Sequence, residues 1–305
     1  RIALEKPKTP VIVSLARAGT PIGVLLRRAL EKLGCKVVHY SISIIRGRGI
    51  DENALSHILG HHSDDDIVFV DGWTGKGAIA GELKAAIKHF NNSHGTRLPE
   101  SLTVLTDLAG IAGLADDGED YLIPSSILNS VVSGLISRSV LNNDYLNEGG
   151  FHGCVFYEEN RNRDVSREFV DELTLAVTPH LTDKELAPAT WDDDDRLKRA
   201  TSTKEFVSAL TLKHGINDIN RVKPGIGEAT RAVLRRIPER VILKSERHED
   251  LQHLITHTPA ITFGYYDSMN ETQTSYQVQV STQSDYSSID MWDTGEITSS
   301  DTAVT

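Results

Sequence analysis

Cysteine and long apolar runs are both scarce in this 305-residue sequence, which contains two cysteines, Cys35 and Cys154. Two cysteines cannot form the disulfide framework of a secreted scaffold, so a reducing compartment, the cytoplasm, is expected. No segment approaches the run of about 18 apolar residues that a membrane-spanning helix needs, so no membrane partner is expected. The chain starts at Arg1 without an initiator methionine or an apolar signal core, and we expect an N-terminal segment to be missing.

Positive charge is absent from the last part of the chain, because residues 248–305 contain 9 Asp/Glu and no Lys or Arg. The net charge of −11 argues against nucleic acid, but the charge is unevenly distributed. Residues 196–247 carry 13 Lys/Arg against 5 Asp/Glu. A basic module between two acidic stretches can bind a polyanion locally, so structured RNA stays among the candidate partners.

Strand and helix patterns alternate in the first half of the sequence. Short β-branched apolar runs predict strands, and stretches with helical spacing follow them. The expected strands are 10–15, 37–43, 67–70 and 102–107, and the expected helices are 21–33, 51–62, 77–90 and 125–141. This alternation predicts an α/β fold with an open, mostly parallel sheet, in which ligands bind beyond the carboxyl ends of the strands.

Composition suggests where the domains lie. Residues 1–157 form the domain with the predicted sheet, and the polar, acidic stretch 158–200 is a predicted connector. Residues 201–280 combine helix and strand patterns into a second, smaller α/β domain. The Ser/Thr/Asp-rich residues 281–305 show no periodicity, which predicts a disordered acidic tail.

The most informative loop follows the third expected strand. Asp71 ends this strand, and a glycine-rich loop leads directly into a helix. Glycines let backbone amides approach an anion, while the helix N-terminus and Lys76 add positive charge. We therefore predict a phosphate site, beside which Asp71 can accept hydrogen bonds from a sugar diol. Its predicted phosphate-binding residues are Gly72, Thr74, Gly75, Lys76 and Gly77.

This loop resembles that of type I phosphoribosyltransferases, in which a hydrophobic strand, two acids and a Thr/Gly-rich turn bind phosphoribosyl pyrophosphate. Here Gly72 replaces the second acid and the loop is short. Four segments resemble one particular family more closely. They are SLARAGTPIGVLLRR, HYSISIIRGRGID, VDGWTGKGAI and VKPGIGEATRAVLRR. They are similar to a bacterial family that joins a phosphoribosyltransferase domain to a Pelota-type RNA-binding domain. That family is associated with tellurium-resistance and stress gene clusters, and is sometimes labelled a StiP-type cysteine protease.

The resemblance implies a Mg²⁺-dependent enzyme that transfers ribose 5-phosphate from phosphoribosyl pyrophosphate to a base or nucleoside-like acceptor. Arg17 and the amides of Ala18 and Gly19 would bind the pyrophosphate. Asp71 would hold the ribose hydroxyls, while Arg17 and Mg²⁺ bound through the pyrophosphate would neutralise the leaving group. The implied folds are a type I phosphoribosyltransferase-like domain and a Pelota-like domain.

Two further segments belong to this predicted active site. Arg46 and Arg48 alternate with glycines after the second strand, which suits a mobile lid that closes over a polyanion and excludes water. The acceptor would lie near the fourth strand, and helix capping explains the serines among its candidates at least as well. These candidates are Asp107, Ser125, Ser126 and Asn129.

The segment 225–236 resembles the G-x-N-E-x-T-[KR] element of Pelota and kink-turn RNA-binding domains, with Gly227 in place of the usual Asn. Amides at the start of this helix offer contacts to RNA phosphates, and Glu228 offers an acceptor for an exposed guanine edge. The predicted RNA-binding residues are Lys223, Gly225, Glu228, Arg231 and Arg235. The alternative is an ordinary helix whose Glu228 favours the dipole and whose arginines face solvent.

Other interpretations stay open. One alternative is a non-catalytic pocket that senses ribose phosphate, with the RNA-binding domain as effector. Such a sensor would not need the second acid that Gly72 replaces. His152 lies two residues before Cys154, which suits a cysteine protease, but Cys154 is explained better as a small buried hydrophobe. A homodimer is a further expectation. A metal site is a weaker alternative to a solvated helix face for His57, His61, His62 and Asp64.

Overall fold

The computed structural model describes most of the first 257 residues and several short strands beyond them. The described residues are 2–5, 9–127, 130–141, 146, 149–181, 193–235, 241–243, 249–257, 262–263, 275–276, 279–280, 292–293 and 297–298. They belong to two compact units, residues 1–231 and residues 232–305.

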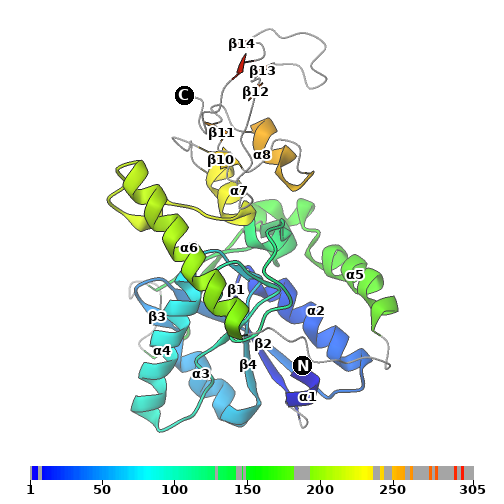
Figure 1. The fold of residues 1–305 in the computed structure, drawn as a ribbon. Helices are drawn as coiled ribbons and strands as arrows, with labels where there is room; N and C mark the ends of the chain where they lie inside the picture. Colours follow the sequence, from blue (N-terminus) through cyan, green and yellow to red (C-terminus); the bar gives the residue numbers. More distant parts are fainter. Residues whose placement is uncertain are drawn as a thin grey trace. The chain divides into compact units, whose positions relative to one another are not determined.

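A five-stranded sheet lies in the first unit. Its strands are β1 (Val11–Ala16), β2 (Val38–Ile45), β3 (Gly49–Ile50), β4 (Ile67–Val70) and β6 (Leu102–Thr103). The strand order is β3-β2-β1-β4-β6, in which only β3 runs antiparallel to its neighbour (Figure 1). The predicted α/β class with a mostly parallel sheet is therefore confirmed, whereas a phosphoribosyltransferase-like identity of the fold is not.

Helices pack against both faces of this sheet. They are α2 (Gly19–Lys32), α3 (Glu52–Leu59) and α4 (Ala78–His94). Successive strand residues point to opposite faces, so Ile12 and Val68 share a core with Ile22 of α2. Val13 and Phe69 pack in a second core with residues of α3 and α4. Burial on both faces explains why these strands are continuous apolar runs in the sequence.

The segment between residues 124 and 156 differs from its prediction as a helix over 125–141, which is wrong. It forms η2 (Pro124–Ile127), η3 (Ser130–Val132), β8 (Ile136–Val140) and β9 (Gly153–Phe156). β8 and β9 pair antiparallel. Gly134 and Leu135 have φ angles of 74° and 58°, and two successive left-handed residues end any right-handed helix.

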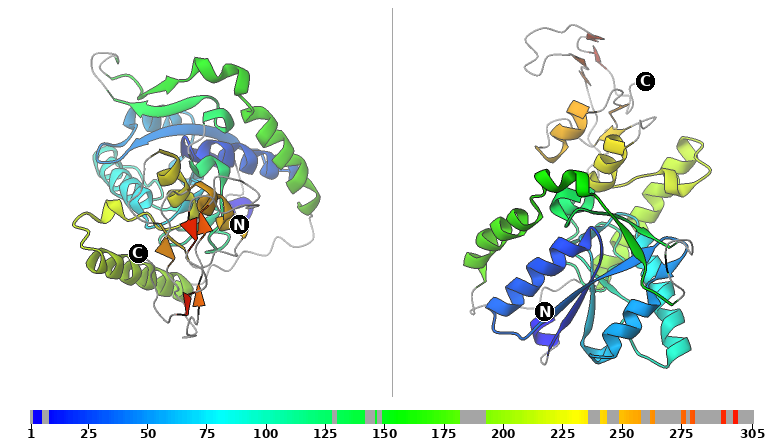
Figure 2. Two further views of the ribbon diagram at one scale, coloured as in Figure 1. Left: turned by 90° about the horizontal axis from the view of Figure 1, so that it is seen from above. Right: turned by 180° about the vertical axis from the view of Figure 1, so that it is seen from behind.

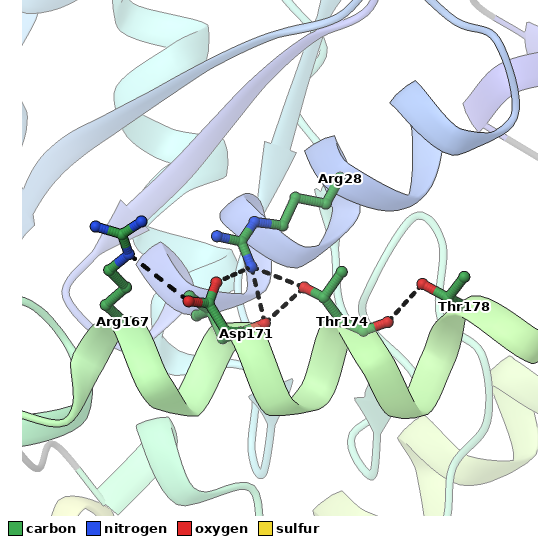
Figure 3. A network of polar contacts seen from close by, with 6 residues as sticks. Arg28, Arg167, Asp171, Thr174 and Thr178 are labelled. Atoms are coloured by element: carbon green, nitrogen blue, oxygen red, sulfur yellow. Dashed lines mark hydrogen bonds and ion pairs between the residues drawn. The ribbon is translucent and has the colours of Figure 1, made fainter.

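The predicted connector over 158–200 contains a helix, α5 (Ser166–Val177), that packs against α2. Arg28 of α2 makes an ion pair with Asp171, with 2.7 Å between Nη1 and Oδ1, and donates to the carbonyl oxygen of Val170 at 3.0 Å (Figure 3). Figure 2 shows α5 beside α2 in the view from behind. The acidic composition of this stretch therefore does not make all of it a connector.

Further elements lie in the remaining described residues. In the first unit they are α1 (Ile2–Glu5), η1 (Asp64–Asp66), β5 (Trp73–Thr74), β7 (Thr106–Asp107), η4 (Glu158–Arg163), η5 (Thr178–His180), α6 (Asp193–Lys213) and η6 (Ile219–Arg221). α7 (Ile226–Arg235) crosses from the first unit into the second. None of the described helices has both the length and the apolar composition needed to cross a membrane.

Among its described residues, the second unit contains η7 (Glu249–Leu251), α8 (Gln252–His257) and six two-residue strands. The strands are β10 (Ile242–Leu243), β11 (Thr262–Phe263), β12 (Ser275–Tyr276), β13 (Gln279–Val280), β14 (Trp292–Asp293) and β15 (Ile297–Thr298). β10 and β11 pair in parallel, and the other strands pair antiparallel. Apart from β14 and β15, the predicted acidic tail lies outside the described residues.

Candidate functional site

The sheet brings two of the predicted ligand loops together. β1 lies between β2 and β4, so the loops after β1 and β4 leave the same edge of the sheet. A Cβ atom at Gly19 would lie 2.8 Å from the carbonyl oxygen of Val70 and 3.2 Å from Asp71 Oδ1. Only glycine allows this approach between the start of α2 and the end of β4.

Asp71 is half-buried between these two loops. Its Oδ1 accepts a hydrogen bond from the Gly72 amide at 2.8 Å. Desolvation by burial raises the pKa of Asp71 to about 7, and the Gly72 hydrogen bond only partly opposes this shift. The carboxyl group therefore titrates near neutral pH.

We expect Asp71→Asn to raise the thermal unfolding midpoint by several degrees near pH 8. The folded state holds this pKa above its unfolded value of 3.8, so the wild type loses stability as the pH rises from about 4 to about 7. The advantage of the variant should grow over that interval and then level off. Thermal unfolding over this pH range measures it, with the exposed Asp116→Asn as control. An advantage that is independent of pH would contradict the shifted pKa.

Two predicted ligand residues bind each other instead of facing solvent. Thr74 Oγ1 donates to Asp107 Oδ1 at 2.6 Å, and Asp107 Oδ2 accepts from the Ala112 amide at 2.7 Å. Thr74 and Asp107 are 5% and 0% exposed. Ser125 is also buried, and its hydroxyl has no hydrogen-bond partner among the described residues. The Ser126 side chain and Asn129 lie outside the described part.

The remainder of the predicted phosphate loop is covered by protein. Lys76 Nζ donates to the carbonyl oxygens of Val222 at 2.7 Å and Ile219 at 3.2 Å. A Cβ atom at Gly75 would lie 2.9 Å from the carbonyl oxygen of Pro224. Burial lowers the pKa of Lys76, while the charge of Glu228 acts in the opposite direction. Lys76 is therefore bound to the segment before α7.

The three arginines of the predicted active site lie in different surroundings. Arg17 is 7% exposed and donates to the carbonyl oxygen of Ile136 at 3.0 Å, so its guanidinium is buried against β8. Ala18 is the N-cap residue of α2. Arg46 and Arg48 are exposed in the turn between β2 and β3. Arg48 also lines a cavity.

This cavity of about 330 Å³ lies between the start of α3 and the segment before β9. Its lining residues are Arg48, Ile50, Asp51, Glu52, Asn53, Leu141, Leu146, Gly149, Gly150 and His152. His152 Nδ1 forms a hydrogen bond with Ser43 Oγ at 2.9 Å. The His152 amide donates to Asp51 Oδ2 at 2.6 Å, while Asp51 Oδ1 accepts from the Ala54 amide at 2.9 Å. The cap of α3 thus also positions the backbone of His152.

The two cysteines differ in exposure. Cys154 is exposed on β9, two residues after His152. Cys35 is half-buried beside the core that α2 covers, and its amide donates to Leu30. Within the described part of the chain, no hydrogen bond joins the Cys154 thiol to another group. The prediction that Cys154 is a buried hydrophobe is therefore wrong, because β8 and β9 leave this side of the hairpin uncovered.

The predicted RNA-binding residues lie around the start of α7. Gly225 has a φ angle of 88°, and Glu228 pairs with Arg231 at 3.0 Å between Oε1 and Nη2. Lys223 is half-buried in the segment before the helix. The side chain of Arg235 lies outside the described part.

The histidine cluster is held by ordinary contacts. His61 Nδ1 bonds to the His57 carbonyl at 2.9 Å, and His62 Nε2 bonds to the Tyr40 hydroxyl at 3.0 Å. Among the described residues, no group of three or more His, Cys, Asp or Glu could hold a metal ion. The expected Mg²⁺ and the expected homodimer stay predictions.

Three residues near these sites, Ser43, Trp73 and Asp120, were not predicted from the sequence. Ser43 lies near the carboxyl end of a predicted strand, which is a signal for a site residue. Trp73 lies inside the glycine-rich loop, where an aromatic residue is a signal for packing. Asp120 has no local signal, because its contact with Ile226 spans 106 positions of the sequence.

Comparison with known proteins gives three matches. Residues 1–174 match the family model described as "Tellurite-like stress resistance cysteine protease StiP", and residues 201–260 match the model described as "PELOTA RNA binding domain". The protein named "Cysteine protease StiP" from Acinetobacter baylyi is 43% identical over 279 residues. This alignment covers 86% of the present chain and 71% of that relative.

These matches overturn the predicted reaction. The predicted enzyme, a phosphoribosyltransferase with phosphoribosyl pyrophosphate as partner, is wrong, because both StiP matches carry the name of a cysteine protease and neither indicates a transferase. The less favoured cysteine protease alternative fits the matches better, while the predicted stress context and Pelota-type segment agree with them. The StiP model covers more than half of the sequence, and the Acinetobacter protein is similar over most of it. The chain therefore belongs to the StiP family of tellurite-like stress resistance cysteine proteases.

Proposed function

We propose that this chain is a thiol peptidase in which Cys154 is the nucleophile and His152 is the general base. The observation that carries the proposal is the exposure of Cys154 two residues after a histidine that lines a cavity. The family name supports the reaction class. Cys35 is a poor alternative, because it is half-buried beside the core and lies between α2 and β2, away from that cavity.

The hydrogen bond between His152 Nδ1 and Ser43 suits a base. When Nδ1 carries the proton and donates to Ser43 Oγ, Nε2 keeps its lone pair and can accept the thiol proton. Asp51 fixes the backbone of His152 through the amide. Catalytic hydrogen bonds are often long in substrate-free enzymes and shorten on binding, so the lack of a Cys154–His152 bond is compatible with this role.

The reaction follows from these assignments. Cys154 Sγ attacks the carbonyl carbon of a peptide bond while His152 takes the thiol proton. The C–N bond breaks, His152 returns the proton to the leaving amine, and a thioester remains on Cys154. Water then attacks the thioester with His152 as base, which releases the carboxylic acid and regenerates the thiol.

Alkylation tests the nucleophile directly. Iodoacetamide is expected to label Cys154 before Cys35 and to stop the hydrolysis of a fluorescent casein in the same proportion, because an exposed, activated thiol reacts faster than a half-buried one. Cys35→Ser should be labelled and inactivated at the wild-type rate. Full hydrolysis by a protein whose Cys154 is completely alkylated would exclude this mechanism.

A second function, RNA binding, is favoured by the Pelota match over residues 201–260. We assign it to Lys223, Gly225, Glu228, Arg231 and Arg235, which lie in or next to α7. If Lys223, Arg231 and Arg235 contact RNA phosphates, raising the salt concentration from about 50 to about 200 mM should weaken RNA binding steeply. A filter-binding series with an RNA hairpin measures this, and affinity that does not change with salt would argue against phosphate contacts.

A further inference from the structure

The glycine turn before α7 rests on a loop of the sheet domain. A Cβ atom at Gly225 would lie 2.8 Å from Trp73 Cζ3 and 2.8 Å from Leu108 Cδ1. At Gly227 it would lie 3.2 Å from the Trp73 indole. Both glycines therefore let the turn approach Trp73 more closely than any other residue would. Ile226 between them is only 6% exposed.

The first backbone amide of α7 already donates a hydrogen bond to a carboxylate of the same chain. The Ile226 amide donates to Asp120 Oδ1 at 2.9 Å and to Oδ2 at 3.1 Å. Ile226 is the first residue of the helix, where unpaired amides and the helix dipole favour an anion. Asp120 thus fills a position at the start of this helix that favours an anion.

A third contact holds the segment on the other side of the turn. Lys76 Nζ donates to the carbonyl oxygens of Val222 and Ile219. The turn is therefore held before its glycines by the Lys76 cation and between them by the Asp120 carboxylate, with Trp73 packed against both glycines. All of these residues belong to the first compact unit.

We propose that Asp120, Trp73 and Lys76 form a clamp that closes the Pelota-type turn, and that RNA binds α7 only when its phosphate displaces the Asp120 carboxylate. The inference rests on the proposed RNA-binding function and adds its regulation. The Ile226 amide cannot satisfy both anions, so RNA binds only the open form. The apparent dissociation constant for RNA is then the intrinsic value divided by the fraction of molecules that are open. By linkage, RNA favours the open clamp and frees Lys76 from the two carbonyl oxygens.

A purely structural cap is the competing explanation. In that case Asp120 would only stabilise the start of α7, and its removal would lower stability without improving RNA binding. Removing any carboxylate also strengthens RNA binding slightly through the overall field. The control must therefore remove an equivalent charge nearby, and Asp116 is an exposed aspartate four residues away.

The experiment measures binding of a fluorescein-labelled RNA hairpin with an asymmetric internal loop by fluorescence anisotropy. Asp120→Ala is expected to bind about tenfold more tightly than the wild-type chain, since it removes a charge-assisted hydrogen bond that competes with RNA. Asp116→Ala should differ from the wild type by less than about twofold. Asp120→Asn keeps an acceptor but loses the charge, so its affinity should lie in between. Amide hydrogen exchange of the peptide containing Ile226 reports clamp opening without RNA, and should be faster in Asp120→Ala.

Each outcome decides a different point. The clamp is supported if Asp120→Ala binds RNA more tightly and exchanges the Ile226 amide faster, while Asp116→Ala does neither. Equal RNA affinity of Asp120→Ala and Asp116→Ala would overturn the competition while RNA binding itself stands. If no protein binds the hairpin although exchange is faster in Asp120→Ala, the proposed RNA function fails, and the role of Asp120 as its competitor fails with it.

Discussion

Substitution of Cys154 by alanine is expected to reduce peptide hydrolysis by at least about a thousandfold, because no thioester can form without the thiol. His152→Ala should cost about 10²- to 10⁴-fold, the usual contribution of a general base. Ser43→Ala removes the bond to His152 Nδ1 and should lower kcat more than it raises KM. Initial rates on a quenched fluorescent peptide library measure these effects.

The matched control is Cys35→Ser, which removes the other thiol of the chain and should leave the rate within about twofold of the wild type. Urea unfolding of every variant separates lost chemistry from lost folding. A folded Cys154→Ala protein that hydrolyses the library at an undiminished rate would refute the assigned nucleophile. Loss of activity in Cys35→Ser alone would move the nucleophile to the other cysteine.

Asp107→Ala is expected to lower the free energy of unfolding by about 3 kcal/mol or more, since it leaves two buried donors unpaired at about 1–3 kcal/mol each. These donors are the Thr74 hydroxyl and the Ala112 amide. Asp107 is completely buried, so water cannot replace the lost acceptor. Urea denaturation monitored by circular dichroism measures the change.

Thr74→Val provides the partner of a double-mutant cycle. It removes one donor and keeps the shape of the side chain, and should cost about 1–3 kcal/mol. The double variant should cost less than the sum of the two single costs, because both remove the same Thr74–Asp107 hydrogen bond. Additive effects, or a cost of Asp107→Ala below about 1 kcal/mol, would show that this bond does not stabilise the loop.

The sheet could be predicted from the sequence because its strands carry their own signal. The strands at 10–15 and 67–70 are buried on both faces of the sheet. Their sequences are therefore continuous apolar runs, and they lack the alternating polar residues of strands with one face in solvent. The helix predicted over 125–141 failed because apolar periodicity does not reveal that Leu135 adopts a positive φ angle. α5 was missed because the acidic composition of residues 158–200 predicted a connector, and its contact with Arg28 of α2 spans 142 positions of the sequence.

The site was less predictable than the fold. The position of Asp71 beside Gly19 follows from strand order, which the alternation of strands and helices in the sequence does not specify. The glycine-rich loop, however, has the composition of a phosphate site whether or not other residues cover it. Sequence could not show that Lys76 binds main-chain oxygens near Val222. It placed His152 next to Cys154, but the partner Ser43 is 109 positions away and becomes visible only in the folded chain.

The contact between Lys76 and Val222 spans 146 positions, which has a consequence for synthesis of the protein. The ribosome completes the sheet long before it reaches the residues that cover the glycine-rich loop. At about 5–20 residues per second, the interval between synthesis of Lys76 and synthesis of Val222 lasts roughly 7–30 s. During that time the Trp73 indole lacks its glycine neighbours, so nascent or prematurely terminated chains present an apolar surface to chaperones that the finished protein hides.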